Sequence, residues 1–281
     1  MQNQSKKYDL IDEFECDYIG IQGEEGSGKT SLLVALLAIN HQKQHKRRKK
    51  VLKKKLKYYN RYNETDVEVP DTFIYTDFDN KVNDKIWRNF VDFNQVRIPK
   101  FDDKPFIYFP YGAVIATSES LDVENNKIEK SSKLDMGRYI FIKKRRHNNI
   151  TMISETQDLD SGAKWERTKF RTIINVKECE VKHLFGCAWL PVIKVKWKIW
   201  IYRGSKQLIN MAFKDIPPLS KFERKNSIYN GEFRTMIEER IIVFKGNIFK
   251  YYNSEEAEDD FSKDLTSYDI CKTNPKTERG S

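Results

Sequence analysis

An eight-residue segment, 23–30, constrains this chain more than any other part of it. The segment reads GEEGSGKT and fits the pattern G-x-x-x-x-G-K-[ST] in full. An apolar run, 17–22, precedes it, and a run that is apolar around most of its helical circumference, 28–40, follows it. A strand, a glycine-rich turn and a helix in this order are the context in which the pattern forms a phosphate-binding loop.

The physical chemistry of such a loop is specific. Glycines let the backbone curl until several N–H groups point at phosphate oxygens, and the following helix adds its positive end. Lys29 brings a charge to the β and γ phosphates, and the Thr30 hydroxyl can bind Mg²⁺. We therefore predict that ATP and Mg²⁺ are bound by Gly23, Gly26, Ser27, Gly28, Lys29, Thr30 and Ser31.

Strand and helix patterns alternate over the first 180 residues. Apolar runs rich in β-branched and aromatic residues predict strands at 17–22, 72–78, 111–117, 149–156 and 172–178. Helical spacing predicts helices at 28–40, 81–94 and 131–148, with Asn40 as a stop for the first. This alternation is typical of an α/β fold, a P-loop NTPase with a mainly parallel sheet between helices.

The domain organisation predicted from these patterns has three parts. Residues 1–180 form the P-loop ATPase domain, which contains a basic insert at 43–62, either an extension of the first helix or a loop. Alternation of apolar residues and lysines at 192–202, and a strand or hairpin at 241–252, predict a smaller β-rich extension over 181–253. An acidic tail, 254–281, is expected to be disordered.

Hydrolysis of ATP requires an acid that orients Mg²⁺ and a group that activates water, both expected at the end of a neighbouring strand. Glu119 follows the strand predicted at 111–117 and suits the water-activating carboxylate. The position before it, usually Asp in such enzymes, is Ser118, a weaker Mg²⁺ ligand. Asp77 or Asp79, after the preceding predicted strand, is the rival acid.

Further candidates surround the strand predicted at 149–156. Gln157 directly follows it, and a polar amide there can contact the γ-phosphate or position water. Arg167 and Arg171 come later and can act as arginine fingers toward a neighbouring subunit, and Arg167 is the one assigned to catalysis. The cations before the strand suit a subunit contact or a nucleic-acid backbone, and they are Arg145, Arg146 and His147.

The net charge of +10 resides in one segment. Residues 43–57 contain ten Lys or Arg and no acid, and the rest of the chain is electrically balanced. Six engaged charges would give a salt slope of roughly −5 on duplex DNA, and the tyrosines at 58, 59 and 62 could stack on bases. The alternatives to nucleic-acid binding are binding to an anionic membrane surface and a solvated loop without a partner. The predicted nucleic-acid ligands are Lys46, Arg47, Arg48, Lys49, Lys50, Lys53, Lys54 and Lys55.

Membrane and metal signals are weak by comparison. No run of about 18 uncharged apolar residues exists, so a spanning helix is not expected, and the first residues lack the apolar core of a signal peptide. We expect a cytoplasmic protein, in a host cytoplasm or virion if viral, with peripheral membrane contact as an alternative. Cys179, His183 and Cys187 lack a strong zinc spacing, so we expect core thiols and no structural zinc.

The order of these motifs resembles the zonula occludens toxin (Zot) family over residues 17–180. The phosphate loop, a strand ending in YTDFDN, a strand with a terminal acid, and the Arg-His pair before a strand ending in Thr-Gln carry the resemblance. Members are assembly or DNA-export ATPases of filamentous phages and relatives, placed in the FtsK/HerA group of DNA-pumping motors. The resemblance implies ATP–Mg²⁺ binding by Lys29 and Thr30, catalysis by Glu119, a sensing amide at Gln157, and the family pair at Arg146 and His147.

Two departures from the family pattern bear on function. Ser118 stands where the family has Asp, and the transmembrane segment that many members carry is absent from this sequence. The leading hypothesis is an ATP-driven DNA packaging, translocation or phage-assembly motor that works as a homo-oligomeric ring. The alternatives are a P-loop kinase of small molecules such as nucleosides, and an ATP-binding assembly protein without hydrolysis.

Overall fold

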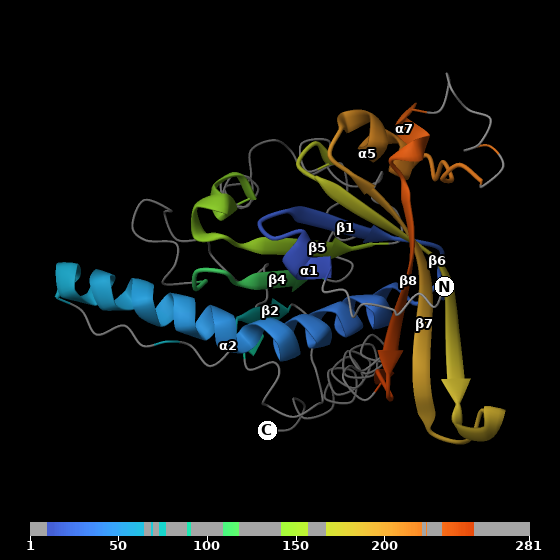
Figure 1. The fold of residues 1–281 in the computed structure, drawn as a ribbon, viewed down its shortest axis with the longest axis horizontal. Helices are drawn as coiled ribbons and strands as arrows, with labels where there is room; N and C mark the ends of the chain where they lie inside the picture. The colour runs from blue at the N-terminus through green and yellow to red at the C-terminus, as the bar shows by residue number, and fades with distance from the viewer. Residues whose placement is uncertain are drawn as a thin grey trace, which may run out of the picture.

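The strands of the described residues form one sheet in a computed structural model of the chain (Figure 1). The described residues are 10–64, 69, 73–76, 89–90, 109–117, 142–156, 167–220, 223 and 232–249. The strand order is β3-β2-β4-β5-β1-β6-β7-β8. The strands are β1 Tyr18–Gln22, β2 Ile74–Thr76, β3 Asn89–Phe90, β4 Val114–Thr117, β5 Thr151–Glu155, β6 Thr172–His183, β7 Val192–Arg203 and β8 Glu238–Lys245.

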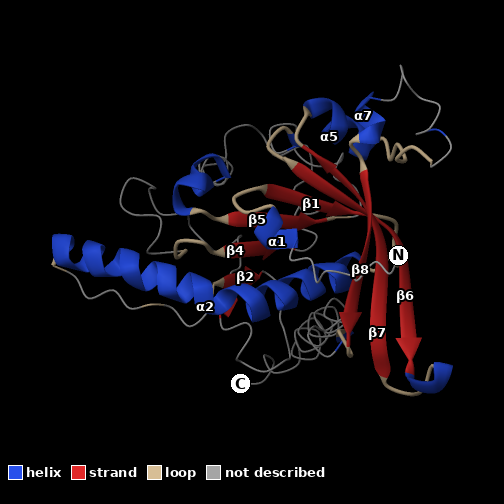
Figure 2. Ribbon diagram, viewed as in Figure 1, coloured by secondary structure: helices blue, strands red, loops and turns tan. Residues whose placement is uncertain are grey.

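The helices of the described part lie on two sides of this sheet (Figure 2). The long α2 packs on one face, and α5 and α7 lie across the other face (Figure 1). The α-helices are α1 Leu10–Glu13, α2 Lys29–Asn63, α5 Lys206–Phe213 and α7 Glu232–Thr235, and the short 3-10 helices are η3 Arg145–Asn148 and η4 Leu184–Gly186.

Strand direction divides the sheet into two parts. The six strands from β3 to β6 are parallel, and β7 and β8 continue the sheet in antiparallel fashion. The predicted α/β class with a mainly parallel sheet is therefore confirmed. In the register of the central strands, Ile21 of β1 lies beside Glu155 of β5, and Gln22 lies beside Asn175 of β6. Strands β1 and β5 thus end at one edge, where open α/β sheets bind ligands, and β6 continues past this edge to His183.

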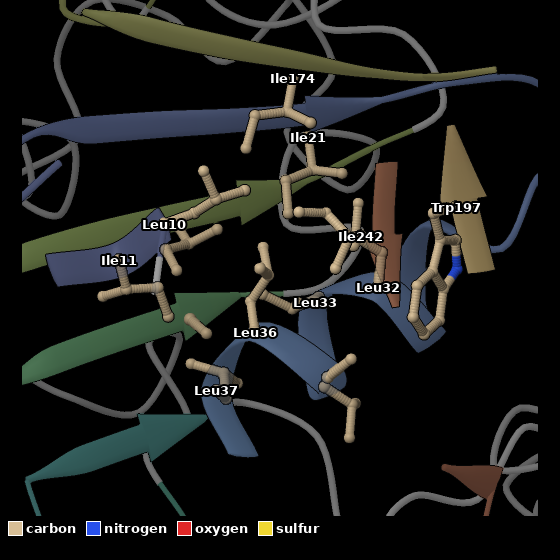
Figure 3. Close-up of a cluster of buried hydrophobic side chains, with 14 of the residues drawn as sticks. Leu10, Ile11, Ile21, Leu32, Leu33, Leu36, Leu37, Ile174, Trp197 and Ile242 are labelled. Carbon is tan, nitrogen blue, oxygen red and sulfur yellow. The ribbon is translucent and has the colours of Figure 1, made fainter. Parts of the chain in front are cut away.

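Alternate residues of the strands supply two separate cores. Ile19 and Ile21 of β1 point to the face covered by α2, and Tyr18 points to the face covered by α5. Leu32, Leu33 and the later leucines of α2 fill the first core (Figure 3). Because the side chains of a strand alternate between faces, a strand that is buried on both faces reads as a continuous apolar run. That is why β1 and β5 are recognisable in the sequence.

Helix α2 is much longer than its apolar segment predicts. It runs for 35 residues, about 52 Å at 1.5 Å per residue, and includes the whole basic segment. Asn40 does not end the helix. Its side chain is buried and accepts a hydrogen bond from Arg48, eight residues further along the helix. Leu52 and Leu56 are buried against Phe73 and anchor the basic segment, whereas Val51, its third apolar residue, is exposed.

Two further predictions are corrected by the strands. Residues 89–90, predicted as helix, form β3 and pair with Tyr75 and Thr76 of β2. Strand β6 continues past 178 as far as His183. The other residues of the helix predicted at 81–94, the first part of that predicted at 131–148, and the acidic tail lie outside the described residues. The strand predicted at 192–202 corresponds to β7, and β8 covers 241–245 of the strand or hairpin predicted at 241–252.

Candidate nucleotide-binding site

The phosphate loop joins the end of β1 to the start of α2, as the motif predicts. Gly26 and Gly28 have positive φ values of 72° and 82°, in the left-handed region that favours glycine. Gly28 is the residue before the first turn of α2, and the Ser27 N–H donates to the carbonyl of Glu24 at 3.1 Å. The glutamates at 24 and 25 are exposed, so their charges face solvent.

Two of the glycines are also required by space. A Cβ on Gly28 would lie 2.8 Å from the sulfur of Cys179, and one on Gly23 would lie 2.8 Å from the carbonyl oxygen of Val176. Both obstacles come from β6, which packs directly behind the loop. Burial raises the pKa of the Cys179 thiol, against a smaller opposite effect from its hydrogen bond with Ser31. The thiol is therefore neutral at pH 7 and does not repel a phosphate.

We expect Gly28→Ala to destabilise the protein more than Gly26→Ala does. Both substitutions force a side chain into left-handed backbone, which costs roughly 1–2 kcal/mol. A Cβ at 26 meets no atom within 4 Å, whereas one at 28 meets Cys179, and overpacking costs a further 1–3 kcal/mol or so. Chemical denaturation of the two variants measures the difference, and equal losses would contradict the crowding seen here.

The lysine of the motif is turned back onto its own loop. Lys29 is 8% exposed, and its Nζ donates to the carbonyl oxygens of Gly23 at 3.0 Å and Glu24 at 2.9 Å. These two acceptors hold the charge at the mouth of the loop. A bound phosphate would offer the ammonium a stronger, charged acceptor in place of the neutral carbonyls.

A carboxylate that the sequence analysis did not select faces the motif threonine. Glu155 is the last residue of β5, is 2% exposed, and accepts a hydrogen bond from Thr30 Oγ1 at 2.7 Å. The adjacency of β5 and β1 brings these groups together across 125 residues of sequence. The signal was present, because Glu155 is an acid at the carboxyl end of a predicted strand, the criterion that selected Glu119.

Support for the loop also comes from β7, in the C-terminal part of the sheet. The indole Nε1 of Trp197 donates to the carbonyl of Gly28 and to Oγ of Ser31, both at 3.1 Å. Ser31 in turn donates to the Gly28 carbonyl at 2.8 Å. Trp197 is fully buried. The first turn of α2 is thus fixed by a strand that the sequence analysis assigned to a separate extension, and no sequence motif indicates this contact.

Several predicted residues lie outside the described part of the chain. They are Ser118, Glu119, Gln157 and the rival acids Asp77 and Asp79. Strand β4 is described as far as Thr117, whose hydroxyl donates to Ser154 of β5 at 3.0 Å. Thr156 is buried, and its N–H donates to the carbonyl of Ile21. The roles predicted for Glu119, Gln157 and Ser118 remain predictions.

The predicted arginines lie at the other edge of the sheet. Arg145, Arg146 and His147 form η3, directly before β5, and Arg167 precedes β6. Parallel strands start at the edge opposite the one where they end, so Arg167 and the phosphate loop of its own chain lie at opposite edges of the sheet. Only a loop of another copy is compatible with the predicted arginine finger.

Five exposed cations of α2 form a stripe along the helix, and the predicted ligands Lys46, Lys49 and Lys53 are exposed outside this stripe. Lys43, Lys50, Lys54, Lys57 and Arg61 are exposed and fall within an arc of about 60° at 3.6 residues per turn. Two predicted nucleic-acid ligands contact the protein itself: Arg48 is buried, and Lys55 is exposed but lies over an aromatic ring. Arg48 is buried with Asn40, and Lys55 Nζ lies 3.6 Å from the centre of the Tyr111 ring. Arg47 pairs with Asp12 at 3.3 Å.

Other predicted features are placed plainly by the structure. Cys179 and His183 lie on strand β6, and Cys187 directly follows the short helix η4. Within the described residues, no cluster of three or more His, Cys, Asp or Glu side chains could hold a metal ion. Over that same part of the chain, no helix combines the length and apolarity needed to cross a membrane.

Comparison with known proteins gives similarities of structure and none of sequence. No protein-family model and no curated protein matches the chain. The N-terminal domain of zonular occludens toxin from Neisseria meningitidis is 11% identical, with a TM-score of 0.44, and covers 85% of this chain and 100% of that domain. The DNA-packaging ATPase B204 from Sulfolobus turreted icosahedral virus is 14% identical, with a TM-score of 0.35, covering 68% and 93%.

A third similar structure is the flagellar accessory protein FlaH from Methanocaldococcus jannaschii, 11% identical with a TM-score of 0.36, covering 70% and 85%. The structure is thus similar to a Zot N-terminal domain, as the order of the motifs predicts. The wider FtsK/HerA grouping stays a prediction. At these identities and scores the similarities concern the fold, and the function is inferred from the residues of this chain.

Proposed function

We propose that this chain is a Mg²⁺-dependent ATP hydrolase that acts on DNA, as a packaging, translocation or assembly motor working in a ring. The observation that carries the proposal is the contact of Thr30 with the buried Glu155 at a complete phosphate loop. The motif alone supports nucleotide binding. A buried carboxylate beside its threonine adds the charge that metal-assisted phosphate chemistry needs.

The residues beside the loop fit a Mg²⁺ ion. Mg²⁺ prefers hard oxygen ligands and is commonly held by one or two carboxylates together with substrate phosphates. Thr30 and Glu155 offer a hydroxyl and a carboxylate 2.7 Å apart, and Ser118 is the other ligand that the sequence predicts. When bound, Mg²⁺ neutralises the charge that develops on the phosphates. In this proposal Glu155 supplies the carboxylate that Ser118 lacks.

The rest of the loop binds and orients the triphosphate. The N–H groups around Gly28 and the positive end of α2 attract phosphate oxygens, and Lys29 exchanges its two carbonyl acceptors for them. Glu119 is proposed to orient the attacking water and Gln157 to contact the γ-phosphate. These assignments rest on the sequence and on the resemblance to the Zot family.

Nucleic-acid binding is proposed for the exposed cations of α2. Lys43 and Arg61 lie 18 residues apart, which is about 27 Å along a helix. A single DNA strand carries one phosphate per roughly 3.4 Å, so this cationic stripe spans about eight phosphates. The rings of Tyr58 and Tyr62 are 73% and 89% exposed, which suits stacking on unpaired bases.

Helix α2 also offers a route by which the two activities are coupled. Its first turn contains Lys29 and Thr30 of the phosphate loop, and its second half carries the cationic stripe. The buried Leu52 and Leu56 and the Asn40–Arg48 hydrogen bond hold the two halves in one continuous helix. A shift of the first turn during the ATP cycle would therefore move the stripe.

The test of this function is ATP turnover with and without DNA. We expect DNA to stimulate hydrolysis in the parent protein, and stimulation to weaken when Lys50, Lys54 and Lys57 are replaced together by Gln. The log–log salt slope of duplex binding should shrink by about 2.7, or 0.9 for each lost phosphate contact. The control variant replaces Lys194, Lys214 and Lys245, at other places on the surface, with Gln.

An unchanged slope in the triple variant would remove α2 from the DNA interface. Transfer of phosphate from ATP to a nucleoside, with no hydrolysis, would favour the small-molecule kinase predicted as an alternative. Tight ATP binding without turnover, in the presence or absence of DNA, would favour an assembly protein that binds nucleotide and does not hydrolyse it.

A further inference from the structure

A cavity lies at the sheet edge opposite the phosphate loop. It has a volume of about 710 Å³ and is lined by residues of three separate segments. These are the segment from Ile142 into η3, the segment before β6, and the turn that leads from β7 into α5. Ile142, Phe170, Ile209 and Phe213 give it an apolar floor.

The described lining of this cavity is strongly cationic. Seven of its residues are Lys or Arg, and none of those described is Asp or Glu. Asp17, the residue before β1, is a nearby acid. Its carboxylate accepts a hydrogen bond from the Thr172 hydroxyl at 3.2 Å and forms an ion pair with Arg203 at 3.5 Å. The seven cations are Lys143, Arg145, Arg146, Arg167, Lys169, Arg171 and Lys206.

Arg145 is the observation that points to a ligand. Its side chain is 5% exposed, and its Nε lacks a hydrogen-bond partner. One of its terminal nitrogens donates to the carbonyl of Ile142. Burial, and then repulsion from Arg146, lowers its pKa to about 10. An unpartnered buried donor is costly, and Arg145 belongs to the lining of this cavity, where the negative charge of a phosphate would stabilise its buried positive charge.

We propose that this cavity binds a chain of phosphate groups, supplied either by a nucleic-acid strand or by the triphosphate of a nucleotide. Seven cations exceed what one monovalent anion needs, and arginine matches phosphate oxygens with two parallel N–H donors. The apolar floor limits competition from water. The first turn of α5 also faces the cavity through Lys206 and adds its positive end.

The site is separate from the phosphate loop. Strand β1 has five residues and spans about 16 Å between the two edges, so one triphosphate cannot occupy both sites of a chain. The inference therefore does not depend on ATP hydrolysis. The second half of α2, which carries the cationic stripe, extends toward the same edge on the other face of the sheet (Figure 1).

Lysine acetylation of the Lys29→Ala protein tests the proposal. The phosphate loop of this variant binds phosphates weakly, so protection of lysines in the cavity reports binding at the cavity. Three probes are used: inorganic tripolyphosphate, a 12-residue thymidylate oligomer and ATPγS. At a probe concentration ten times its dissociation constant, we expect acetylation of Lys143, Lys169 and Lys206 to be about tenfold slower, since only the unliganded fraction reacts. Lys194 and Lys245, on β7 and β8, serve as internal controls measured by mass spectrometry.

Charge reversal provides a second measurement that does not rely on the buried Arg145. Arg171→Glu alters an exposed residue of the lining, and Lys144→Glu makes the same charge change beside the lining. We expect Arg171→Glu to raise the dissociation constant obtained from the protection at least about tenfold, the loss of one charge-assisted hydrogen bond. Lys144→Glu should leave it unchanged.

The three probes distinguish the sources of the phosphates. Stronger protection by the oligomer than by tripolyphosphate supports a nucleic-acid strand, and stronger protection by ATPγS supports a nucleotide. Equal protection by all three supports the shared phosphate chemistry. If no probe protects the three lysines, or if both charge reversals act equally, the proposal is overturned.

Discussion

Replacement of Lys29 by Ala is expected to weaken ATP binding about 10- to 150-fold, equivalent to the 1.5–3 kcal/mol or so of a hydrogen bond to a charged group. The ammonium is nearly buried at the mouth of the loop, where its two carbonyl acceptors hold it in reach of a phosphate. Alanine removes this charge and leaves the backbone N–H groups to bind the triphosphate alone. Calorimetric titration with ATP and Mg²⁺ measures the change.

Lys245→Ala is the matched control, because it removes the same charge from the exposed end of β8. It should bind ATP as the parent does. Far-ultraviolet circular dichroism verifies that both variants keep the helical content of α2. Equal ATP affinity in Lys29→Ala and the parent would remove the phosphate loop as the nucleotide site, and with it the proposed hydrolase.

Glu155→Gln is expected to reduce Mg²⁺-dependent ATP hydrolysis by about a hundredfold or more, because metal assistance supplies several kcal/mol of transition-state stabilisation. Glutamine has nearly the shape of glutamate and can still accept the hydrogen bond from Thr30. The substitution therefore removes the charge and leaves the packing at the end of β5. A structural role alone would not require the carboxylate charge.

Nucleotide binding separates a metal-binding role of Glu155 from other roles without reference to activity. In the parent, Mg²⁺ should tighten ATPγS binding, and in Glu155→Gln this increment should shrink while affinity in EDTA stays the same. Glu239→Gln, on β8, is the surface control. Glu119→Gln should keep the Mg²⁺ increment and lose hydrolysis, as expected for a group that acts on water. A full Mg²⁺ increment in Glu155→Gln would assign the metal to other ligands.

The contrast between these glutamates illustrates where sequence reasoning reached its limit. The criterion of an acid at the carboxyl end of a predicted strand applies to Glu119 and Glu155 alike. What distinguishes Glu155 is the adjacency of β5 and β1, which sets its carboxylate against Thr30. Strand order arises from contacts between distant segments, and no local pattern records it.

Helix α2 gives a second example. The sequence of the basic segment is compatible with both a helix and a loop, because its like charges repel one another and it has few apolar residues. The structure resolves the choice through burial of Leu52 and Leu56 beside Phe73 and through the Asn40–Arg48 pair. Tertiary packing overrides weak local propensity in such segments. Burial of Arg48 also removes it from the cations that can reach a nucleic acid.

The amino-acid sequence by itself determined the phosphate loop, the strands around it and the concentration of positive charge, because each depends on spacing within a few residues. Local spacing fixes which φ values, hydrogen bonds and buried faces a segment can adopt. Only the tertiary structure decided that Trp197 and Cys179 support the loop, that Glu155 faces Thr30, and that Arg145 lines a cationic cavity. These contacts join residues from different strands and turns, and they exist only once the sheet has assembled.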